Sequence, residues 1–276
     1  MLHYYKYNAL ISTSANYYII KQQGIYTMLN KKLLTLAVST ILLSSASVVS
    51  VAQAGLSADV GVTSAYVFRG IQDSTPAVYG GISFSHESGV HANVWTSSTG
   101  VSGGNETDLT IGWGTKMGEI EFDVSFIDYL YPSSTSLTGS DDLGDNDIQE
   151  IAISASMGPI SIAVNKAIAN PGSTSSSKTV SGVTTITTGL PENKYTYFAI
   201  SGSMDKIGVT LGMYDDDISS TADYKHLDVN FSATDNLTFS VTKTFDAGTT
   251  STGLSGTGSS SQNPIVRVSY DLAFDL

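Results

Sequence analysis

The last stretch of the chain, residues 264–276, alternates apolar and polar side chains up to its final position. Even-numbered positions from Val266 to Leu276 are apolar, and odd-numbered positions from Arg267 to Asp275 are mostly polar. A period of two residues is typical of a β-strand with one apolar and one polar face. A strand at the end of a chain needs a partner for its backbone, and a closed barrel, which has no free edge, supplies one.

The same alternation recurs after residue 54 in segments of about ten residues, as in membrane barrels. Apolar residues do not recur there at helical spacing, so we expect no helix in this part. Together with the final stretch the strands number twelve, and single-chain bacterial barrels have an even number. The other predicted strands cover residues 58–69, 77–86, 90–96, 108–115, 120–131, 148–157, 160–168, 195–204, 207–214, 224–233 and 237–245.

Short and long connections alternate between these strands. The short ones lie at 87–89, 116–119, 158–159, 205–206 and 234–236; the long ones are 70–76, 97–107, 132–147, 169–194, 215–223 and 246–263. Outer-membrane barrels sort their connections in this way, with short periplasmic turns and longer external loops. A soluble β-sandwich has the same strand pattern but no reason to sort its loops by length. We therefore predict an all-β fold, a closed antiparallel transmembrane β-barrel of about twelve strands.

Aromatic residues lie near both ends of the predicted strands, where the two membrane interfaces would be. Ordinary β-propensity is the alternative explanation, because aromatic residues favour strands in any case. Near the long loops are Tyr66, Phe68, Tyr129, Tyr131, Tyr214, Tyr224 and Phe245; near the short turns are Phe84, Trp113, Phe231 and Phe274.

The N-terminal region has the features of a targeting segment. Residues 28–54 contain two lysines, an apolar run and the small-residue site Ala52-Gln53-Ala54, which together indicate a signal peptide that is cleaved after Ala54. A membrane anchor is the alternative. Residues 1–27 precede this complete signal peptide, and we interpret them as upstream sequence from a misplaced start, or else as an extension with its own role. The barrel is expected to cover residues 55–276.

Composition narrows the classes of function. All 25 acidic residues lie after residue 54, whereas four of the 13 basic residues lie before it, so the mature chain has a net charge of −16. This charge disfavours nucleic acid as a partner. The chain has no cysteine, which excludes disulfides and thiol chemistry. The mean hydropathy of +0.06 is compatible with a membrane barrel, because alternating strands average out on a hydropathy scale.

Five short motifs follow one another between Val60 and Trp95. They are Tyr66-Val67-Phe68-Arg69-Gly70, Pro76-Ala77-Val78, Gly80-Gly81, His86-Glu87-Ser88-Gly89 and the tryptophan at 95. In this order and spacing the run resembles the opening of the Gcw_chp proteins, which are also called TorF-type porins. Beyond this run the resemblance rests on the strand pattern alone. It implies a proteobacterial outer-membrane protein, and it brings neither catalytic residues nor a defined substrate.

If the apolar faces meet lipid, the polar faces line the interior. Acidic side chains in a water-filled lumen concentrate cations, so we expect a weak preference for cations. Alternatively these groups pair across the interior and plug it, with the two arginines contacting carboxylates such as Asp59, Asp271 or Asp108. The candidate pore-lining residues are Asp59, Arg69, Asp108, Glu121, Asp123, Glu150, His226, Asp228, Arg267 and Asp271.

Other charged groups suggest further contacts. Lys166, Lys225 and Lys243 share the lipid-facing parity near the long loops, where they can extend to the membrane interface or contact lipopolysaccharide phosphate. The acidic runs 141–147 and 215–217 could hold a divalent cation through oxygen ligands, but neither has the spacing of an EF-hand loop. We predict no metal site and no cofactor.

The sequence thus predicts an exported bacterial outer-membrane barrel, a porin that passively admits small solutes or ions and is not an enzyme. Its expected partners are outer-membrane lipid and lipopolysaccharide, the solutes, and the barrel-assembly machinery, which would bind the C-terminal strand. A plugged structural or adhesive barrel that presents its Ser/Thr-rich loops is one alternative. A hydrolase is another, because His86, His91 and His226 are available, although the sequence identifies no nucleophile.

Overall fold

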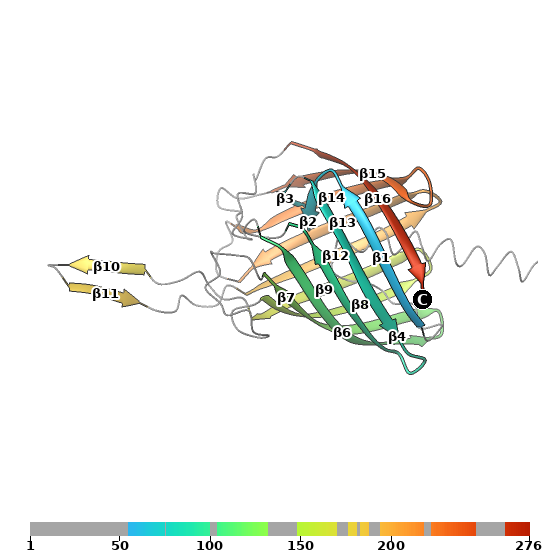
Figure 1. The fold of residues 1–276 in the computed structure, drawn as a ribbon, viewed down its shortest axis with the longest axis horizontal. Coiled ribbons are helices and arrows are strands. Elements are labelled where there is room, and N and C mark those ends of the chain that lie inside the picture. Colours follow the sequence, from blue (N-terminus) through green and yellow to red (C-terminus); the bar gives the residue numbers. More distant parts are fainter. Residues whose placement is uncertain are drawn as a thin grey trace, which may run out of the picture.

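The chain folds as a barrel of twelve antiparallel strands with two small hairpins in its connections (Figure 1). The computed structural model describes residues 55–74, 76–99, 104–131, 148–169, 176–180, 183–187, 194–217, 222–246 and 263–276, so the predicted signal peptide and residues 1–27 lie outside the described part. The barrel strands are β1 (Gly55–Thr63), β4 (Ala77–Ser85), β5 (Val90–Ser97), β6 (Glu106–Met117), β7 (Ile120–Leu130), β8 (Ile148–Met157), β9 (Ile160–Ala169), β12 (Tyr195–Met204), β13 (Ile207–Asp216), β14 (Tyr224–Ser232), β15 (Leu237–Phe245) and β16 (Ile265–Asp275).

The first and last barrel strands close the sheet. β1 pairs with β16 from Ser57↔Asp275 to Thr63↔Ser269, and it pairs with β4 along its other edge. Around the ring the order is β1-β16-β15-β14-β13-β12-β9-β8-β7-β6-β5-β4. The predicted closed antiparallel barrel is therefore confirmed, and so is the terminal stretch as its closing strand.

Side chains along the barrel strands alternate between the exterior and the interior. In β13, Ile207, Val209, Leu211 and Met213 are exposed on the outside, whereas the residues between them are buried. Each of the twelve strands contributes exposed aliphatic or aromatic side chains to the exterior. A continuous apolar surface of this kind is a liability in water but matches the hydrocarbon core of a bilayer. The exterior is therefore that of a transmembrane barrel.

The connections are sorted by length between the two ends of the barrel. One end, which we call the turn end, carries the five tight connections together with the start of β1 and the end of β16 (Figure 1). The opposite end, the loop end, carries the longer connections. Gly89, Gly118 and Gly158 in the tight turns have φ values of 91°, 66° and 58°, a backbone conformation that favours glycine. The predicted sorting of short and long connections is confirmed.

The first predicted strand, 58–69, is wrong in its second half. β1 ends at Thr63, and the chain then forms a hairpin of β2 (Tyr66–Phe68) and β3 (Ile71–Ser74), which is a sheet separate from the barrel. Arg69 and Gly70 at its tip have φ values of 45° and 88°. Positive φ at both central positions is what the tightest hairpin turn requires, because its twist matches that of the strands. The motif 66–70 therefore forms a hairpin turn.

The other predicted strand boundaries are closer to the structure. The predictions 148–157, 195–204 and 237–245 match β8, β12 and β15 at both ends. In the predicted loop 169–194 the structure adds a second hairpin, in which β10 (Ser176–Val180) pairs with β11 (Val183–Thr187). The described residues contain no helix long and apolar enough to cross a membrane.

The aromatic belt near the loop end is largely wrong, whereas the one near the turn end is confirmed. Phe84, Trp113, Phe231 and Phe274 are all exposed on the exterior, between 46% and 48%. Near the loop end, only Phe245 of the seven predicted aromatics remains on the exterior face, half-buried. The reason is strand parity, because the tyrosines of β7, β13 and β14 occupy interior positions, and the hairpin carries its own two aromatics inward. The six buried residues are Tyr66, Phe68, Tyr129, Tyr131, Tyr214 and Tyr224.

A lysine in the middle of an exterior face tests the membrane contact. Ile153 lies at the centre of β8 and exposes 56% of its surface. We expect Ile153→Lys to lower the free energy of unfolding by about 2–4 kcal/mol in lipid vesicles, because the charge would lie in hydrocarbon. Urea titration of the folded fraction measures this. Ile153→Leu is the control and should cost less than about 1.5 kcal/mol. Equal stabilities for the two variants would mean that this face does not meet lipid.

Truncation of the closing strand tests its role in assembly. Deletion of residues 273–276 removes the partners of Ser57, Ala58 and Asp59, and also the bond from the Leu276 amide to the Leu56 carbonyl at 2.9 Å. The edge of β1 would then be open in the membrane, where an unpaired backbone is costly. We expect loss of heat-modifiable protein from the membrane fraction. Phe274→Leu retains the backbone pairs and should assemble normally; normal assembly of the truncation would contradict the expectation.

Candidate functional site

The hairpin of β2 and β3, residues 66–74, lies inside the barrel near the loop end, and we call it the inner hairpin. Residues 66–69 each expose 9% of their surface or less. At the tip, the hydroxyl of Thr244 on β15 donates a hydrogen bond of 2.5 Å to the carbonyl oxygen of Gly70. A side chain at Gly70 would collide with His226 on β14, so the tip is packed against the wall at β14 and β15. The inner hairpin therefore occupies part of the lumen near the loop end.

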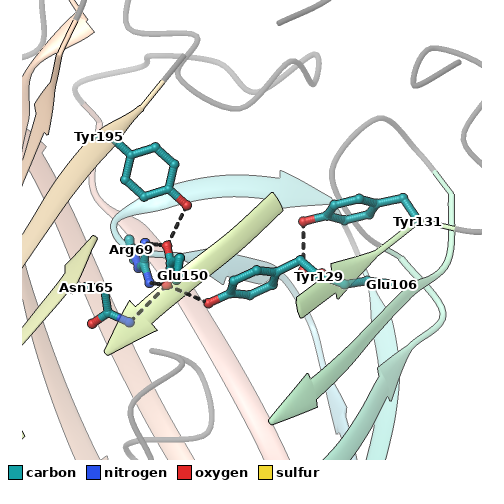
Figure 2. A network of polar contacts seen from close by, with 7 residues as sticks. All are labelled: Arg69, Glu106, Tyr129, Tyr131, Glu150, Asn165 and Tyr195. Atoms are coloured by element: carbon teal, nitrogen blue, oxygen red, sulfur yellow. Dashed lines mark hydrogen bonds and ion pairs between the residues drawn. The ribbon is translucent and has the colours of Figure 1, made fainter. Parts of the chain in front are cut away.

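A buried ion pair joins the inner hairpin to the wall. Arg69 donates from Nη1 and Nη2 to the two oxygens of Glu150 on β8, each at 2.7 Å (Figure 2). Glu150 is fully buried, and Arg69 exposes 2% of its surface. A charge removed from water in this way is costly unless it is paired and hydrogen-bonded. The bidentate arrangement supplies both requirements, because the planar guanidinium matches the two carboxylate oxygens.

The wall strands complete the surroundings of Glu150. The hydroxyl of Tyr129 on β7 and the amide of Asn165 on β9 both donate to Oε2 at 3.0 Å, and the hydroxyl of Tyr195 on β12 donates to Oε1 at 2.5 Å (Figure 2). Glu150 thus accepts five hydrogen bonds. Since all three wall donors are neutral, the charge of Glu150 is balanced by Arg69 alone among these contacts.

Aromatic rings enclose the guanidinium of Arg69. Its central carbon lies 4.6 Å from the ring centroid of Phe68, 4.5 Å from that of Tyr197 and 5.8 Å from that of Tyr195. A cation over an aromatic face at this range is attracted by the electron-rich ring. Of these rings, those of Tyr195 and Tyr197 belong to the barrel wall, whereas Phe68 belongs to the inner hairpin.

A second buried carboxylate holds the base of the inner hairpin. The hydroxyl of Tyr66 donates to Glu106 Oε2 at 2.8 Å, and that of Tyr131 donates to Oε1 at 3.2 Å. The ring of Tyr66 stacks on Trp95 with centroids 6.1 Å apart. Glu106 is the first residue of β6 and exposes 2% of its surface. The inner hairpin is therefore fixed to the wall at two points, Glu106 on β6 and Glu150 on β8.

His226 lies beneath the hairpin tip in a third polar cluster. Its Nε2 is 2.9 Å from the hydroxyl of Tyr197, and its Nδ1 is 3.1 Å from Asp228 Oδ2. The hydroxyl of Thr242 donates to the same aspartate. Gly212 leaves space for the contact between His226 and Tyr197, because a Cβ at Gly212 would lie 2.0 Å from His226 Nε2. His226 is fully buried, so it serves the packing of the interior.

Toward the turn end the interior is lined by smaller side chains that are only partly buried, such as Ser83, Ser161 and Ser201. Two of the predicted pore-lining residues, Asp123 and Glu121, lie in this half, and each has a polar partner there. Asp123 accepts hydrogen bonds from the hydroxyl of Ser125 and contacts Nε2 of His91, both at 2.6 Å. Glu121 forms an exposed ion pair with Lys116 at 2.8 Å. This half therefore combines small, partly buried side chains with the buried contact between His91 and Asp123.

The other predicted pore-lining residues lie on the interior face of the barrel, but they do not form one connected cluster. Asp271 accepts a hydrogen bond of 2.5 Å from the hydroxyl of Tyr79, with Asp59 as its diagonal neighbour on β1. The predicted pairing of Arg69 with Asp59, Asp271 or Asp108 is wrong, because the inner hairpin carries Arg69 across to Glu150. Asp108 lies between Trp95 and Tyr129 in the sheet register. Arg267 is buried at 4% exposure and forms no ion pair within the described segments.

Two of the three exterior lysines predicted near the loop end, Lys166 and Lys225, have partners in the chain. Lys166 binds Asp217 at 2.7 Å and Thr196 at 3.0 Å, and Lys225 binds Asp246 at 2.7 Å. These exposed pairs contribute little to stability, because water screens them. They position positive charge at the predicted membrane interface.

The described residues contain neither a cluster of metal-ligating side chains nor a cluster of histidines that would suggest a hydrolase. The acidic run 141–147 lies outside them, and within them no three metal-ligating side chains converge. His86 contacts the hydroxyl of Ser88 at 2.9 Å in an exposed turn, and this contact is local to two neighbouring positions. The three histidines lie in separate places, paired with Ser88, Asp123 and Tyr197.

Sequence reasoning missed several residues of the interior network, chiefly Glu106, Asn165 and the tyrosines. Parity contained the signal for most of them. Tyr195 and Tyr197 alternate with exposed Phe198 and Ile200, so they had to face inward once the aliphatic face was recognised as exterior. Glu106 fell in a predicted loop, because β6 begins two residues earlier than the alternation indicated.

Comparison with known proteins identifies a family. The sequence profile of Gcw_chp, described as a bacterial protein of unknown function, matches residues 49–219, which is more than half of the chain. No curated protein matches the chain significantly.

Three solved structures are similar at low identity. The KdgM porin is 9% identical with a TM-score of 0.43, over 80% of this chain and 99% of that chain. A mutant of the Rh. blastica porin is 12% identical with a TM-score of 0.34, over 72% and 55%. A chain from a study of in-meso crystallization of membrane proteins is 10% identical with a TM-score of 0.48, over 80% and 84%.

Removal of one partner of the buried ion pair should destabilise the barrel strongly. We expect Glu150→Ala to lower the free energy of unfolding by about 3–5 kcal/mol, because it leaves the charge of Arg69 buried and uncompensated. The double variant Arg69→Met/Glu150→Leu removes both charges and should recover most of the loss. Glu121→Ala, which breaks the exposed pair with Lys116, is the matched control and should cost less than about 1 kcal/mol. Urea unfolding measures all three; equal losses for Glu150→Ala and Glu121→Ala would contradict the role of burial.

Proposed function

The chain belongs to the Gcw_chp family of bacterial proteins, and from the geometry of its barrel we propose that it is an outer-membrane porin whose passage is closed at the loop end by the inner hairpin. In this proposal the turn end faces the periplasm and the loop end faces outward, as in other outer-membrane barrels. Small solutes or ions cross passively when the inner hairpin leaves the lumen.

One observation carries the proposal: the inner hairpin is a sheet of its own. β2 and β3 pair with each other, and the twelve strands close the wall without them. Thr63 and Ala77, on either side of the hairpin, are direct partners in the β1–β4 ladder. The barrel therefore remains intact in its backbone pairing if the hairpin moves. Since twelve strands enclose more space than the eight-stranded barrels that side chains fill, the emptied lumen would be wide enough for small solutes.

The charge of the interior supports a preference for cations. Carboxylates face the interior on both sides of the barrel, including the predicted Asp59, Asp108, Glu121 and Asp228. A lumen with excess negative charge raises the local concentration of cations and repels anions. We therefore propose that cations and cationic solutes pass more readily than anions.

The exterior supports the proposed location and partners. Its apolar band would contact outer-membrane lipid, and Lys166 and Lys225 near the loop end would lie beside lipopolysaccharide phosphate. The closing strand β16 ends at the turn end, where the barrel-assembly machinery would bind it from the periplasm. Export through the predicted signal peptide, residues 28–54, belongs to the same proposal.

A second candidate is a plugged surface barrel that presents its loops. The burial of Arg69, Glu150 and the tyrosines around them favours it, because water touches 2% or less of Arg69, Glu150, Tyr129 and Tyr195. In that case the inner hairpin stays in the lumen permanently, and the external loops carry the function.

Conductance of a hairpin-deleted variant separates the two candidates. Replacement of residues 65–75 by a short Gly-Ser linker joins β1 to β4, whose ends are already adjacent. We expect discrete conductance steps in planar bilayers, larger and more frequent than those of the wild type, with a reversal potential that shows cation preference. Empty vesicles and the wild type are the controls. Silence of both proteins at high load, with heat-modifiable migration intact, would overturn the porin and favour the plugged barrel.

A further inference from the structure

The wall around Glu150 has the features of a binding site even without the inner hairpin. Glu150, Tyr129, Asn165, Tyr195 and Tyr197 come from β7, β8, β9 and β12, which are consecutive strands in the barrel. The three neutral donors orient the carboxylate, and the rings of Tyr195 and Tyr197 stand beside it. Arg69 is the one member of this cluster that the separate hairpin supplies (Figure 2).

We propose that this wall cluster is a recognition site for the guanidinium group of a solute, and that Arg69 is its built-in occupant. The inference rests on the proposed function in one respect, because the solute must reach the site through the lumen. In the closed state Arg69 occupies the site, and a solute with a guanidinium group competes with it.

The geometry selects a guanidinium over other cations. The two hydrogen bonds from Arg69 to Glu150 are both 2.7 Å long, which requires a planar fork with two parallel donors. The same planar group lies 4.5 Å from the centroid of Tyr197, as a stacked guanidinium does. An ammonium group is a compact point charge and cannot make both contacts. The matched pair of probes is therefore ethylguanidinium and ethylammonium.

The site is preorganised on the wall. Tyr129, Asn165 and Tyr195 hold Glu150 through hydrogen bonds of 2.5–3.0 Å, independently of Arg69. Binding to a group already held in place loses little entropy, which favours affinity. In the wild type, Arg69 is tethered next to the site at a high effective concentration, so a free solute competes at a disadvantage. Removal of the Arg69 side chain should therefore reveal the site.

Thermal unfolding in detergent micelles tests the proposal on the full mature chain. For Arg69→Ala, ethylguanidinium should raise the unfolding midpoint by roughly 5–10 °C at a hundredfold excess over its Kd. Ethylammonium at equal ionic strength should give a smaller shift. The wild type should shift less than Arg69→Ala, because its site is occupied, and Arg69→Ala/Glu150→Gln should not shift with either probe.

Two outcomes would overturn the site: equal shifts with both probes in Arg69→Ala, or a shift that persists in Arg69→Ala/Glu150→Gln. If Arg69→Ala does not fold, Arg69→Gln serves in its place: its neutral amide can still donate to Glu150 but competes with the probe less strongly than the guanidinium of the wild type, and the same outcomes decide. The assay needs no conduction. If the protein binds ethylguanidinium but does not conduct in bilayers, the guanidinium site stands and the proposed porin function is overturned. If it conducts but does not bind, the porin function stands and the site is overturned.

Discussion

The closure of the backbone hydrogen-bond ladder is the constraint on which the rest of this structure depends. Within a bilayer every backbone N–H and C=O must find a partner in the protein, so a sheet that crosses it cannot have an open edge. The pairing of β1 with β16 removes the two edges at once, from Ser57↔Asp275 to Thr63↔Ser269. Once the ring is closed, the pleat sends alternate side chains to lipid and to the interior, and the whole arrangement of apolar and polar positions follows.

Closure also creates the problem that the interior network solves. A ring of twelve strands encloses more space than ordinary side chains on its wall can fill. Here tyrosines and the inner hairpin occupy the loop half, and the buried carboxylates of Glu106 and Glu150 each accept hydrogen bonds from two tyrosine hydroxyls. Tyrosine suits this position, because its ring fills volume while its hydroxyl bonds to a polar group. Glu150 shows the result, with five donors and one compensating charge in a place that water does not reach.

Much of the fold could be predicted from the sequence, because alternation and loop length are local signals. β8, β12 and β15 were predicted to the residue, and the closing role of β16 followed from its unbroken pattern. The inner hairpin could not be predicted in this way, since Tyr66 and Phe68 continue the parity of Val60 and Val62 beyond the true end of β1. The interior position of Arg69 and Glu150 was predicted, but not their pairing, because the two residues are 81 positions apart and meet only through the hairpin turn.

The anchors of the inner hairpin have a consequence for folding. Ser64, just before the inner hairpin, bonds to Val268, 204 positions away, and Gly70 at the tip bonds to Thr244, 174 positions away. Contacts between such distant positions form slowly, because a long loop must close before they add stability. The inner hairpin is among the first segments of the barrel to leave the ribosome, yet its docking depends on strands made near the end of synthesis. Docking of the inner hairpin therefore requires strands that follow it by more than 170 positions in the sequence.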